Sequence, residues 1–267
     1  MREIFQNIAM NVVDAVMAII PRAAPSRASL EVCKIVSHRG EHDNDTILEN
    51  TLAAYEQARA VSVWGIEGDI RFTADLVPVI CHDATTERVF GESIAVADTS
   101  FEELRRRLPQ IPSLDEVIAQ FGGSTHLMLE IKDEPRPDAA AQKQKLQSLL
   151  GPLEPVRDFH MLALNPALFE IVDFLPKAAL LPVAELNTAA MSRASLANDL
   201  AGLAGHYLLM TGQVLQQHRA RGQKIGTGFP ASKHCLFREL NRGVEWIFTN
   251  EAVKLQRIRD RQLSRSR

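Results

Sequence analysis

The sequence predicts an α/β protein, a (β/α)8 barrel, and three observations support this fold class. The chain has 267 residues, close to the roughly 250 residues of a single barrel. Hydrophobic residues make up 46% of the chain, which is enough to fill one sizeable core. From Cys33 to Asn250, short apolar runs alternate with helical stretches, as in strands that are each followed by a helix.

Eight short apolar runs of strand length are predicted to form the barrel. The predicted strands are Lys34–His38, Gly65–Arg71, Leu127–Ile131, Met161–Leu164, Ala179–Val183, Tyr207–Met210, Lys224–Gly228 and Trp246–Thr249. The predicted helices between them include Thr51–Ala60, Gln142–Leu150, Ala167–Phe174, Val214–Arg221 and Lys233–Asn241.

One segment interrupts the alternation after the second predicted strand. Val77–Asp83 predicts an extra short strand, and two Ser-x-x-Glu capping patterns, beginning at Ser100 and Ser113, each predict the start of a short helix. Residues 84–124 are therefore predicted to form a small inserted subdomain. Since barrel active sites lie at the C-terminal ends of the strands, we expect this insertion to cover the substrate.

The N-terminal residues predict a separate element. Between residues 2 and 20, apolar side chains recur three and four positions apart, which predicts an amphipathic helix. Polar residues interrupt this segment, so it lacks the continuous apolar run of a signal peptide or a membrane-spanning helix. Residues 1–30 are thus expected to be a helix and linker, and residues 31–260 the barrel domain.

Two interpretations of the first helix stay open. It either closes the bottom of the barrel or a subunit interface, or it lies on a membrane surface. Arg2 alone is a poor basic face for anionic lipid, which favours the first interpretation. A monomer and a homodimer are both compatible with the sequence.

Charge and cysteine content exclude several classes of protein. The chain has 30 Lys and Arg against 33 Asp and Glu, without the basic excess that is typical of a nucleic-acid-binding protein. Its three cysteines form no Cys-x-x-Cys pair, which argues against a disulfide framework or a zinc knuckle. We therefore expect a cytoplasmic protein, with peripheral membrane contact as the alternative if the first helix binds lipid.

Acidic and basic residues fall at the ends of the predicted strands. Glu67 and Asp69 are two positions apart, so their side chains point to the same side of one strand, as do those of Glu130 and Lys132 on the next. Carboxylates that converge at a barrel mouth provide the oxygen ligands that Mg2+ and Ca2+ prefer.

Two histidines and two basic residues complete this set. His38 and His82 end predicted strands and are expected to exchange protons near neutral pH. Arg39 and Lys132 supply positive charge for a phosphate group.

Five short motifs in this order resemble the glycerophosphodiester phosphodiesterase family. They are His38-Arg39-Gly40, Glu49-Asn50-Thr51, Glu67-x-Asp69, His82-Asp83 and Glu130-x-Lys132. The resemblance covers most of the chain from about Ile35 to Asn250, the second half mainly by its strand pattern. It implies a TIM barrel with a small inserted subdomain and hydrolysis of glycerophosphodiesters to glycerol 3-phosphate and an alcohol, with a divalent metal.

The resemblance also implies a role for each of these residues. The metal ligands are Glu67, Asp69 and Glu130, the acid and base are His38 and His82, and the phosphate contacts are Arg39 and Lys132. Glu49 and Asn50 are expected to orient Arg39 or the metal site. The ion is expected to be Mg2+ or Ca2+, with Mn2+ as a third choice.

Three departures from the family pattern leave the substrate open. The loop Glu41–Leu48 lacks the proline that commonly precedes the Glu-Asn-Thr motif, Gly226–Pro230 replaces a Trp-Thr-Val-Asn strand, and Asn250 stands where an Asp is usual. A lysophospholipid or another phosphodiester is therefore an alternative substrate. A barrel that binds phosphodiesters without turnover is a second alternative, against which the complete set of motif residues argues.

Several polar residues also have a structural interpretation. The acidic residues of the set are alternatively an ion-pair network with Arg71 and Lys132, although three buried acids without a metal are costly. The loop His42–Asp45 is interpreted as a turn and Arg105–Arg107 as a solvated helix face. Structural or surface positions are assigned to His126, His160, His206, His218 and His234.

Overall fold

The structure, a computed structural model, describes residues 15–135 and 138–265, and its parallel sheet closes into a barrel. Eight parallel strands follow one another around the barrel, and β1 pairs with both β9 and β2, which closes it. They are β1 (Lys34–His38), β2 (Gly65–Phe72), β4 (His126–Ile131), β5 (Phe159–Ala163), β6 (Leu180–Ala184), β7 (Gly202–His206), β8 (Lys224–Gly228) and β9 (Trp246–Thr249). The extra strand, β3 (Pro78–Ile80), pairs antiparallel with β2.

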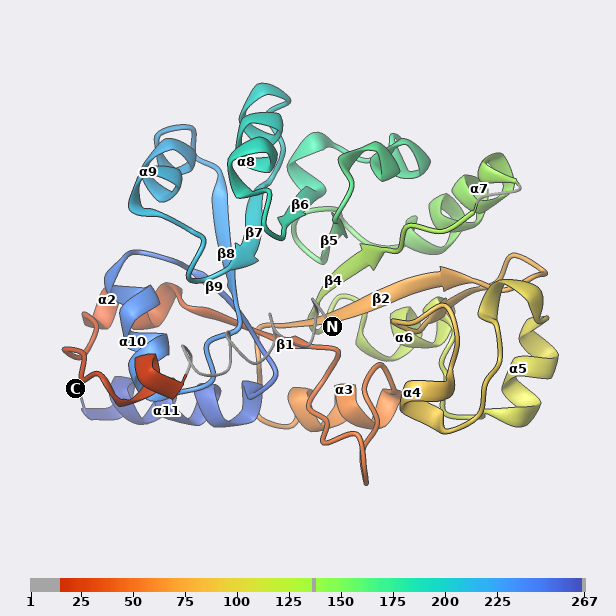
Figure 1. Cartoon of the computed structure of the whole chain (residues 1–267), viewed down its shortest axis with the longest axis horizontal. Coiled ribbons are helices and arrows are strands. Elements are labelled where there is room, and N and C mark those ends of the chain that lie inside the picture. The colour runs from red at the N-terminus through yellow and green to blue at the C-terminus, as the bar shows by residue number, and fades with distance from the viewer. Residues whose placement is uncertain (1–14, 136–137, 266–267) are drawn as a thin grey trace.

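Helices surround the strands (Figure 1). The α-helices are α2 (Arg27–Val32), α3 (Leu52–Arg59), α4 (Glu87–Phe90), α5 (Phe101–Arg107), α6 (Leu114–Phe121), α7 (Ala139–Leu150), α8 (Thr188–Ala197), α9 (Gly212–Ala220), α10 (Lys233–Asn241) and α11 (Ala252–Arg265). Three short 3-10 helices are η1 (Val96–Asp98), η2 (Pro166–Val172) and η3 (Lys177–Ala179). None of the helices among the described residues is long and apolar enough to cross a membrane.

Serine and threonine side chains begin several of these helices. Thr51, Ser100, Ser113 and Ser232 each accept a hydrogen bond from a backbone N–H in the first turn, which satisfies donors that the helix itself leaves free. At Ser113 the reciprocal bond is also present, so the capping box predicted for α6 is complete.

The (β/α)8 fold predicted from the sequence is confirmed, but one strand was predicted in the wrong place. The sixth barrel strand, β7, is Gly202–His206, and the predicted segment Tyr207–Met210 forms the turn after it. Two glycines weaken the strand signal of β7, and a Cβ on Gly205 would lie 2.8 Å from the carbonyl oxygen of Ala184 on β6. The apolar run comes one element later because Tyr207 and Met210 of the turn are buried. The predicted helix at Ala167–Phe174 is the 3-10 helix η2.

The interior of the barrel changes from apolar to charged along the strands. Side chains from strands around the whole sheet, including Val36, Met128 and Leu162, pack against one another and therefore fill its interior. Because side chains alternate along a strand, His38 faces the same side as Val36, and Glu130 the same side as Met128. The C-terminal ends of these strands thus direct charged groups into the barrel mouth.

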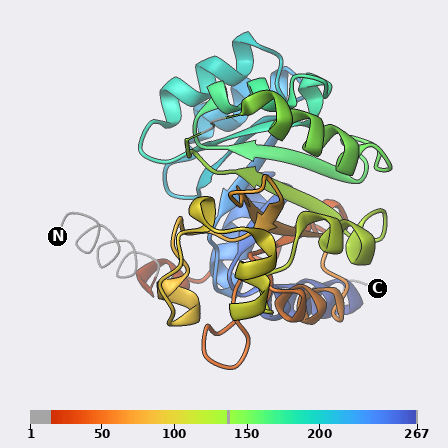
Figure 2. The same ribbon diagram turned by 90° about the vertical axis from the view of Figure 1, so that its right-hand side faces the viewer.

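The insertion has a small core of its own. Val79, Cys81, Ile94, Leu104 and Ile111 belong to a cluster separate from the main core. In Figure 1 α5 lies just beyond the arrowhead of β2, and in Figure 2, where this side faces the viewer, the yellow helices of the insertion lie in front. Helix α6 instead contributes to the main core, so it covers the barrel like the other helices. Of the predicted N-terminal helix, residues 15–19 are helical and the rest lies outside the described residues.

Gly68 on β2 allows helix α3 to approach the sheet closely. A Cβ at this position would lie 1.9 Å from the hydroxyl oxygen of Tyr55 on α3. Both residues are buried, so neither has free space into which to move. We predict that Gly68→Ala lowers the free energy of unfolding by about 1–3 kcal/mol, the usual cost of overpacking. Urea denaturation of both proteins measures this difference.

Gly212 provides the matched control. It is the first residue of α9, and a Cβ there meets no atom within 4 Å. Gly212→Ala should keep the stability or raise it by up to about 1 kcal/mol, since Ala favours the helix over Gly. Equal stability of Gly68→Ala and wild-type protein would contradict the close approach of Tyr55.

Candidate active site

Three carboxylates meet inside the C-terminal mouth of the barrel. Glu67 and Asp69 come from β2 and Glu130 from β4, where Glu130 is the register partner of Asp69. Each offers one oxygen, and these oxygens lie within 4.8 Å of one another. All three residues are buried. In the part of the chain that the structure describes, this is the one such group able to hold a metal ion.

Two cations offset part of this negative charge. Lys132 Nζ lies 2.7 Å from Asp69 Oδ1 and 2.5 Å from Glu130 Oε1, and Arg39 Nε lies 3.3 Å from Asp69 Oδ2. The cluster therefore has three acidic and two basic side chains. Asp69, which contacts both cations, has a pKa below its ordinary value although its burial opposes this.

Glu67 is the carboxylate with the least compensation. Burial, and then the charges of Asp69 and Glu130, raise its pKa well above the ordinary value. Burial also raises the pKa of Glu130. These residues fit a divalent cation because it would supply the missing positive charge and because oxygen donors are the ligands that Mg2+ and Ca2+ prefer.

His38 lies beside the carboxylates. Its Nδ1 is 2.7 Å from Asn250 Oδ1, and because an amide oxygen only accepts, Nδ1 carries the proton. The other ring nitrogen, Nε2, lies 3.8 Å from Glu67 Oε2. Burial and the neighbouring Arg39 guanidinium lower the pKa of His38 to about 3, so the ring is neutral near pH 7. The ring of Phe229 lies 4.7 Å from that of His38.

His82 follows β3 and is oriented by its neighbour. Its Nδ1 lies 2.6 Å from Asp83 Oδ1, which leaves Nε2 free of this bond and suited to accept or donate a proton. Burial lowers the pKa of His82, and the charge of Asp69 opposes this change.

Glu49 and Asn50 contact the same cluster from the loop before α3. Glu49 Oε1 accepts a hydrogen bond of 2.9 Å from Arg39, and Asn50 Nδ2 donates one of 2.8 Å to Asp69 Oδ2. The hydroxyl of Tyr55 in turn donates to Asn50 Oδ1, at 3.2 Å. The sequence placed both residues near Arg39 and the acidic cluster, and these contacts are present. Their functional role stays a prediction.

Residues 38–161, which include all of these side chains except Asn250 and Phe229, match the sequence model of the glycerophosphoryl diester phosphodiesterase family. This part of the chain is thus similar to the family. The bovine glycerophosphodiester phosphodiesterase 1 is 35% identical over 116 residues, which cover 36% of this chain and 34% of that protein. A glycerophosphodiester phosphodiesterase of Caldanaerobacter subterraneus is 32% identical over 110 residues, or 37% of this chain and 44% of that protein. The chain thus spans less than half the length of these curated relatives.

Solved structures resemble the fold over a larger part of the chain. A phosphodiesterase of Oleispira antarctica in complex with the product sn-glycerol-3-phosphate has a TM-score of 0.71 at 22% identity, covering 85% of this chain and 96% of that one. A glycerophosphodiester phosphodiesterase of Thermotoga maritima has a TM-score of 0.70 at 19% identity, covering 85% and 98%. At these identities the likeness concerns the fold.

Three residues around the site were not among the predicted site residues, although Asn250 and the segment Gly226–Pro230, which contains Phe229, were noted as departures from the family pattern. Arg88 on α4 binds Glu49 and Asp83, Asn250 binds His38, and Phe229 packs on the His38 ring. Asn250 and Phe229 directly follow β9 and β8, so their positions at strand ends were a signal that could have found them. Arg88 lies in the insertion, where the strand pattern gives no such signal.

Other polar groups have structural contacts. Arg71 binds Glu134 at 2.8 Å and donates to the backbone carbonyl oxygen of His82 at 2.9 Å. Asp43 accepts three backbone N–H bonds, from residues 45, 46 and 47, as expected of a turn. The three arginines of α5 are all ion-paired, with Glu116, Glu103 and Glu92. His126 and His160 are buried and lie 2.8 Å apart, Nε2 to Nδ1.

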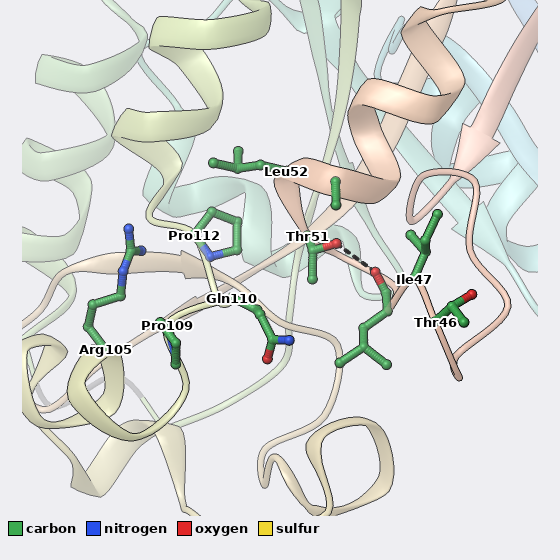
Figure 3. Close-up of a pocket in the computed structure, with 10 residues that line it drawn as sticks. Thr46, Ile47, Thr51, Leu52, Arg105, Pro109, Gln110 and Pro112 are labelled. Carbon is green, nitrogen blue, oxygen red and sulfur yellow. Dashed lines mark hydrogen bonds between the residues drawn. The ribbon is translucent and has the colours of Figure 1, made fainter.

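A separate pocket of about 200 Å3 lies outside the candidate site (Figure 3). Ile47, Thr51, Arg105 and Pro112 help to form it, between the loop before α3 and the insertion. In Figure 3 the hydroxyl of Thr51 bonds the carbonyl oxygen of Leu48, at 2.7 Å. The acidic residues and histidines of the candidate site are not among the described residues that line this pocket.

Glu49 gives the stability of this protein a distinct pH dependence. Burial alone would raise its pKa, but hydrogen bonds from Arg88 and the charge of Arg39 lower it to about 2 from the ordinary 4.5. A group with a lowered folded pKa stabilises the protein above the unfolded value, and this contribution is lost as the pH falls through the folded value. We predict that Glu49→Gln loses up to about 3 kcal/mol relative to wild type at neutral pH, and that this difference shrinks between pH 4.5 and 2.

Urea denaturation of both proteins at several pH values between 7 and 2 measures this difference. The wild-type series accounts for the titration of all other carboxylates. A stability difference that stays constant over the whole range would show that Glu49 is not ionised in this network.

Proposed function

We propose that this protein hydrolyses glycerophosphodiesters to glycerol 3-phosphate and an alcohol with the help of a divalent cation. The observation that carries this proposal is the buried group of three carboxylates beside His38, with oxygens within 4.8 Å of one another. The match of residues 38–161 to the glycerophosphoryl diester phosphodiesterase family model supports the reaction class. The product-bound structure of the Oleispira antarctica phosphodiesterase supports the substrate class.

Glu67, Asp69 and Glu130 are the proposed ligands of the cation. When bound, a divalent cation polarises phosphoryl oxygens and offsets the charge of the transition state. Lys132 and Arg39 already lie against these carboxylates, at 2.7 Å and 3.3 Å from Asp69. We propose that both hold the phosphate of the substrate, since a lysine ammonium and an arginine guanidinium are effective donors to phosphate oxygens.

His38 and His82 are the proposed acid and base. One accepts the proton of the attacking oxygen, which belongs to water or to a neighbouring glycerol hydroxyl. The other donates a proton to the alcohol oxygen as its bond to phosphorus breaks. Attack by the hydroxyl forms a cyclic phosphate first, which water then opens to glycerol 3-phosphate. In each ring Nδ1 is engaged, by Asn250 and by Asp83, and Nε2 is the nitrogen suited to this transfer.

A lysophospholipid is the second candidate substrate. Three large apolar side chains are exposed just after strands β5, β6 and β8, at the same end of the barrel as the carboxylates: Leu164 at 38%, Leu186 at 72% and Phe229 at 37%. Polar groups thus lie at the ends of β1, β2 and β4, and exposed apolar groups follow β5, β6 and β8. An acyl chain would bury this exposed apolar surface.

The first experiment measures release of glycerol 3-phosphate from glycerophosphocholine. It is run with Mg2+, Ca2+ or Mn2+ and with EDTA, and lysophosphatidylcholine is tested in parallel for choline release. We expect turnover that depends on the metal and stops with EDTA, because the carboxylate cluster lacks one positive charge without it. Absence of turnover on both substrates with every metal would refute the proposed function.

Glu67→Gln tests the proposed metal site. The change preserves size and shape but removes the carboxylate with the least compensated charge. It should abolish metal-dependent turnover and weaken Mn2+ binding, while circular dichroism shows an intact fold. Full activity of this variant would remove Glu67 from the metal site.

Replacement of either histidine tests the acid and base. His38→Ala or His82→Ala should lower kcat by roughly two to four orders of magnitude, the usual contribution of proton transfer by a side chain. His234→Ala is the control, because His234 lies on α10 and bonds the backbone N–H of Arg22. A loss below tenfold at both positions would mean that other groups transfer the protons.

A further inference from the structure

Arg88 connects the insertion to two residues of the candidate site, His82 and Arg39, through one acidic residue each. It lies on α4, and its guanidinium has three donors directed at two acidic residues. Nε lies 2.5 Å from Asp83 Oδ2, and Nη2 and Nη1 lie 2.6 Å and 3.2 Å from the two oxygens of Glu49. The planar guanidinium thus binds Glu49 through both of its terminal nitrogens and Asp83 through the third.

Each of these acidic residues contacts one residue of the proposed machinery. Asp83 binds His82 Nδ1 at 2.6 Å through the oxygen that Arg88 leaves free. Glu49 binds Arg39 at 2.9 Å through an oxygen that also accepts from Arg88. One guanidinium therefore lies a single side chain away from a proposed acid or base and from a proposed phosphate contact.

These polar contacts add to a limited apolar packing of α4. The helix has four residues, none of them fully buried, and its half-buried Phe90 packs against the core of the insertion. The arginines of α5 pair with acidic residues of the insertion or of α6: Glu116, Glu103 and Glu92. Arg88 instead reaches Glu49, which precedes α3 in the barrel part of the chain.

We propose that Arg88 is a positioning residue of the reaction, which fixes the orientation of His82 through Asp83 and of Arg39 through Glu49. This inference rests on the proposed function. Without the guanidinium, Asp83 loses the partner that fixes its second oxygen, so its bond to His82 is no longer held in one direction. Glu49 keeps only Arg39 as a cationic partner, which draws Arg39 toward Glu49 and away from the phosphate.

Arg88→Gln tests this proposal in the full chain, with Arg106→Gln as the matched control. Arg106 is on α5 of the same insertion, and its ion-pair partner is Glu103, three residues earlier. We expect kcat/KM of Arg88→Gln to fall about 10- to 100-fold, the usual effect of removing a group that orients site residues. The loss should divide between a lower kcat, through His82, and a higher KM, through Arg39. Arg106→Gln should stay within about twofold of wild type, as expected for an exposed ion pair.

Arg88→Lys distinguishes the contribution of positioning to the activity from that of positive charge. An ammonium group keeps the positive charge but lacks the planar fork that reaches both acidic residues, so this variant should recover only part of the lost activity. If kcat and KM of Arg88→Gln stay within twofold of wild type while its melting temperature falls, Arg88 is merely structural and the proposal is overturned.

A second readout does not depend on turnover. The His82 Nδ1 proton, held by Asp83, should give a downfield resonance in the proton NMR spectrum of the wild type. We expect this resonance to shift or disappear in Arg88→Gln and to stay in Arg106→Gln. An unchanged resonance in Arg88→Gln would overturn the positioning of His82. If the wild type lacks turnover on both substrates, the proposed function fails, and this resonance still decides on the contact itself.

Discussion

Charge balance in the buried mouth of the barrel is the constraint on which the rest of the site depends. A buried carboxylate is stable only if it is paired, hydrogen-bonded or protonated. Lys132 and Arg39 keep Asp69 ionised, while Glu67 stays short of a cationic partner and has a raised pKa. Surrounding polar groups also bind these carboxylates, as Asn50 does by donating a hydrogen bond to Asp69. The cluster is thus arranged for one further positive charge.

The periodicity of the strands explains why most of this site could be predicted from the sequence. Two-residue spacing puts Glu67 and Asp69 on one side of β2, and closure of the barrel directs that side inward. Parallel strands then bring Glu130 beside Asp69 by register alone. Three strands, β1, β8 and β9, have the bounds that the sequence predicted.

The remaining features depend on contacts that a single sequence does not reveal. β7 is rich in glycine because its neighbours approach closely, and that closeness follows from the closed sheet rather than from local propensity. Arg88 reaches Glu49 across 39 positions of the chain, and Asn250 reaches His38 across 212. No periodic pattern links such distant residues. Only the fold of the loops and of the insertion brings them together.

The close approach at Gly68 has a consequence for how this protein can vary. Tyr55 fills the space above Gly68 and bonds Asn50, which bonds Asp69, so a packing position and a proposed metal ligand are joined through two hydrogen bonds. A larger residue at 68 and the tyrosine at 55 compete for the same space. Substitutions at these two positions are therefore expected to be tolerated in pairs rather than singly, and the effect of either will depend on which residue occupies the other.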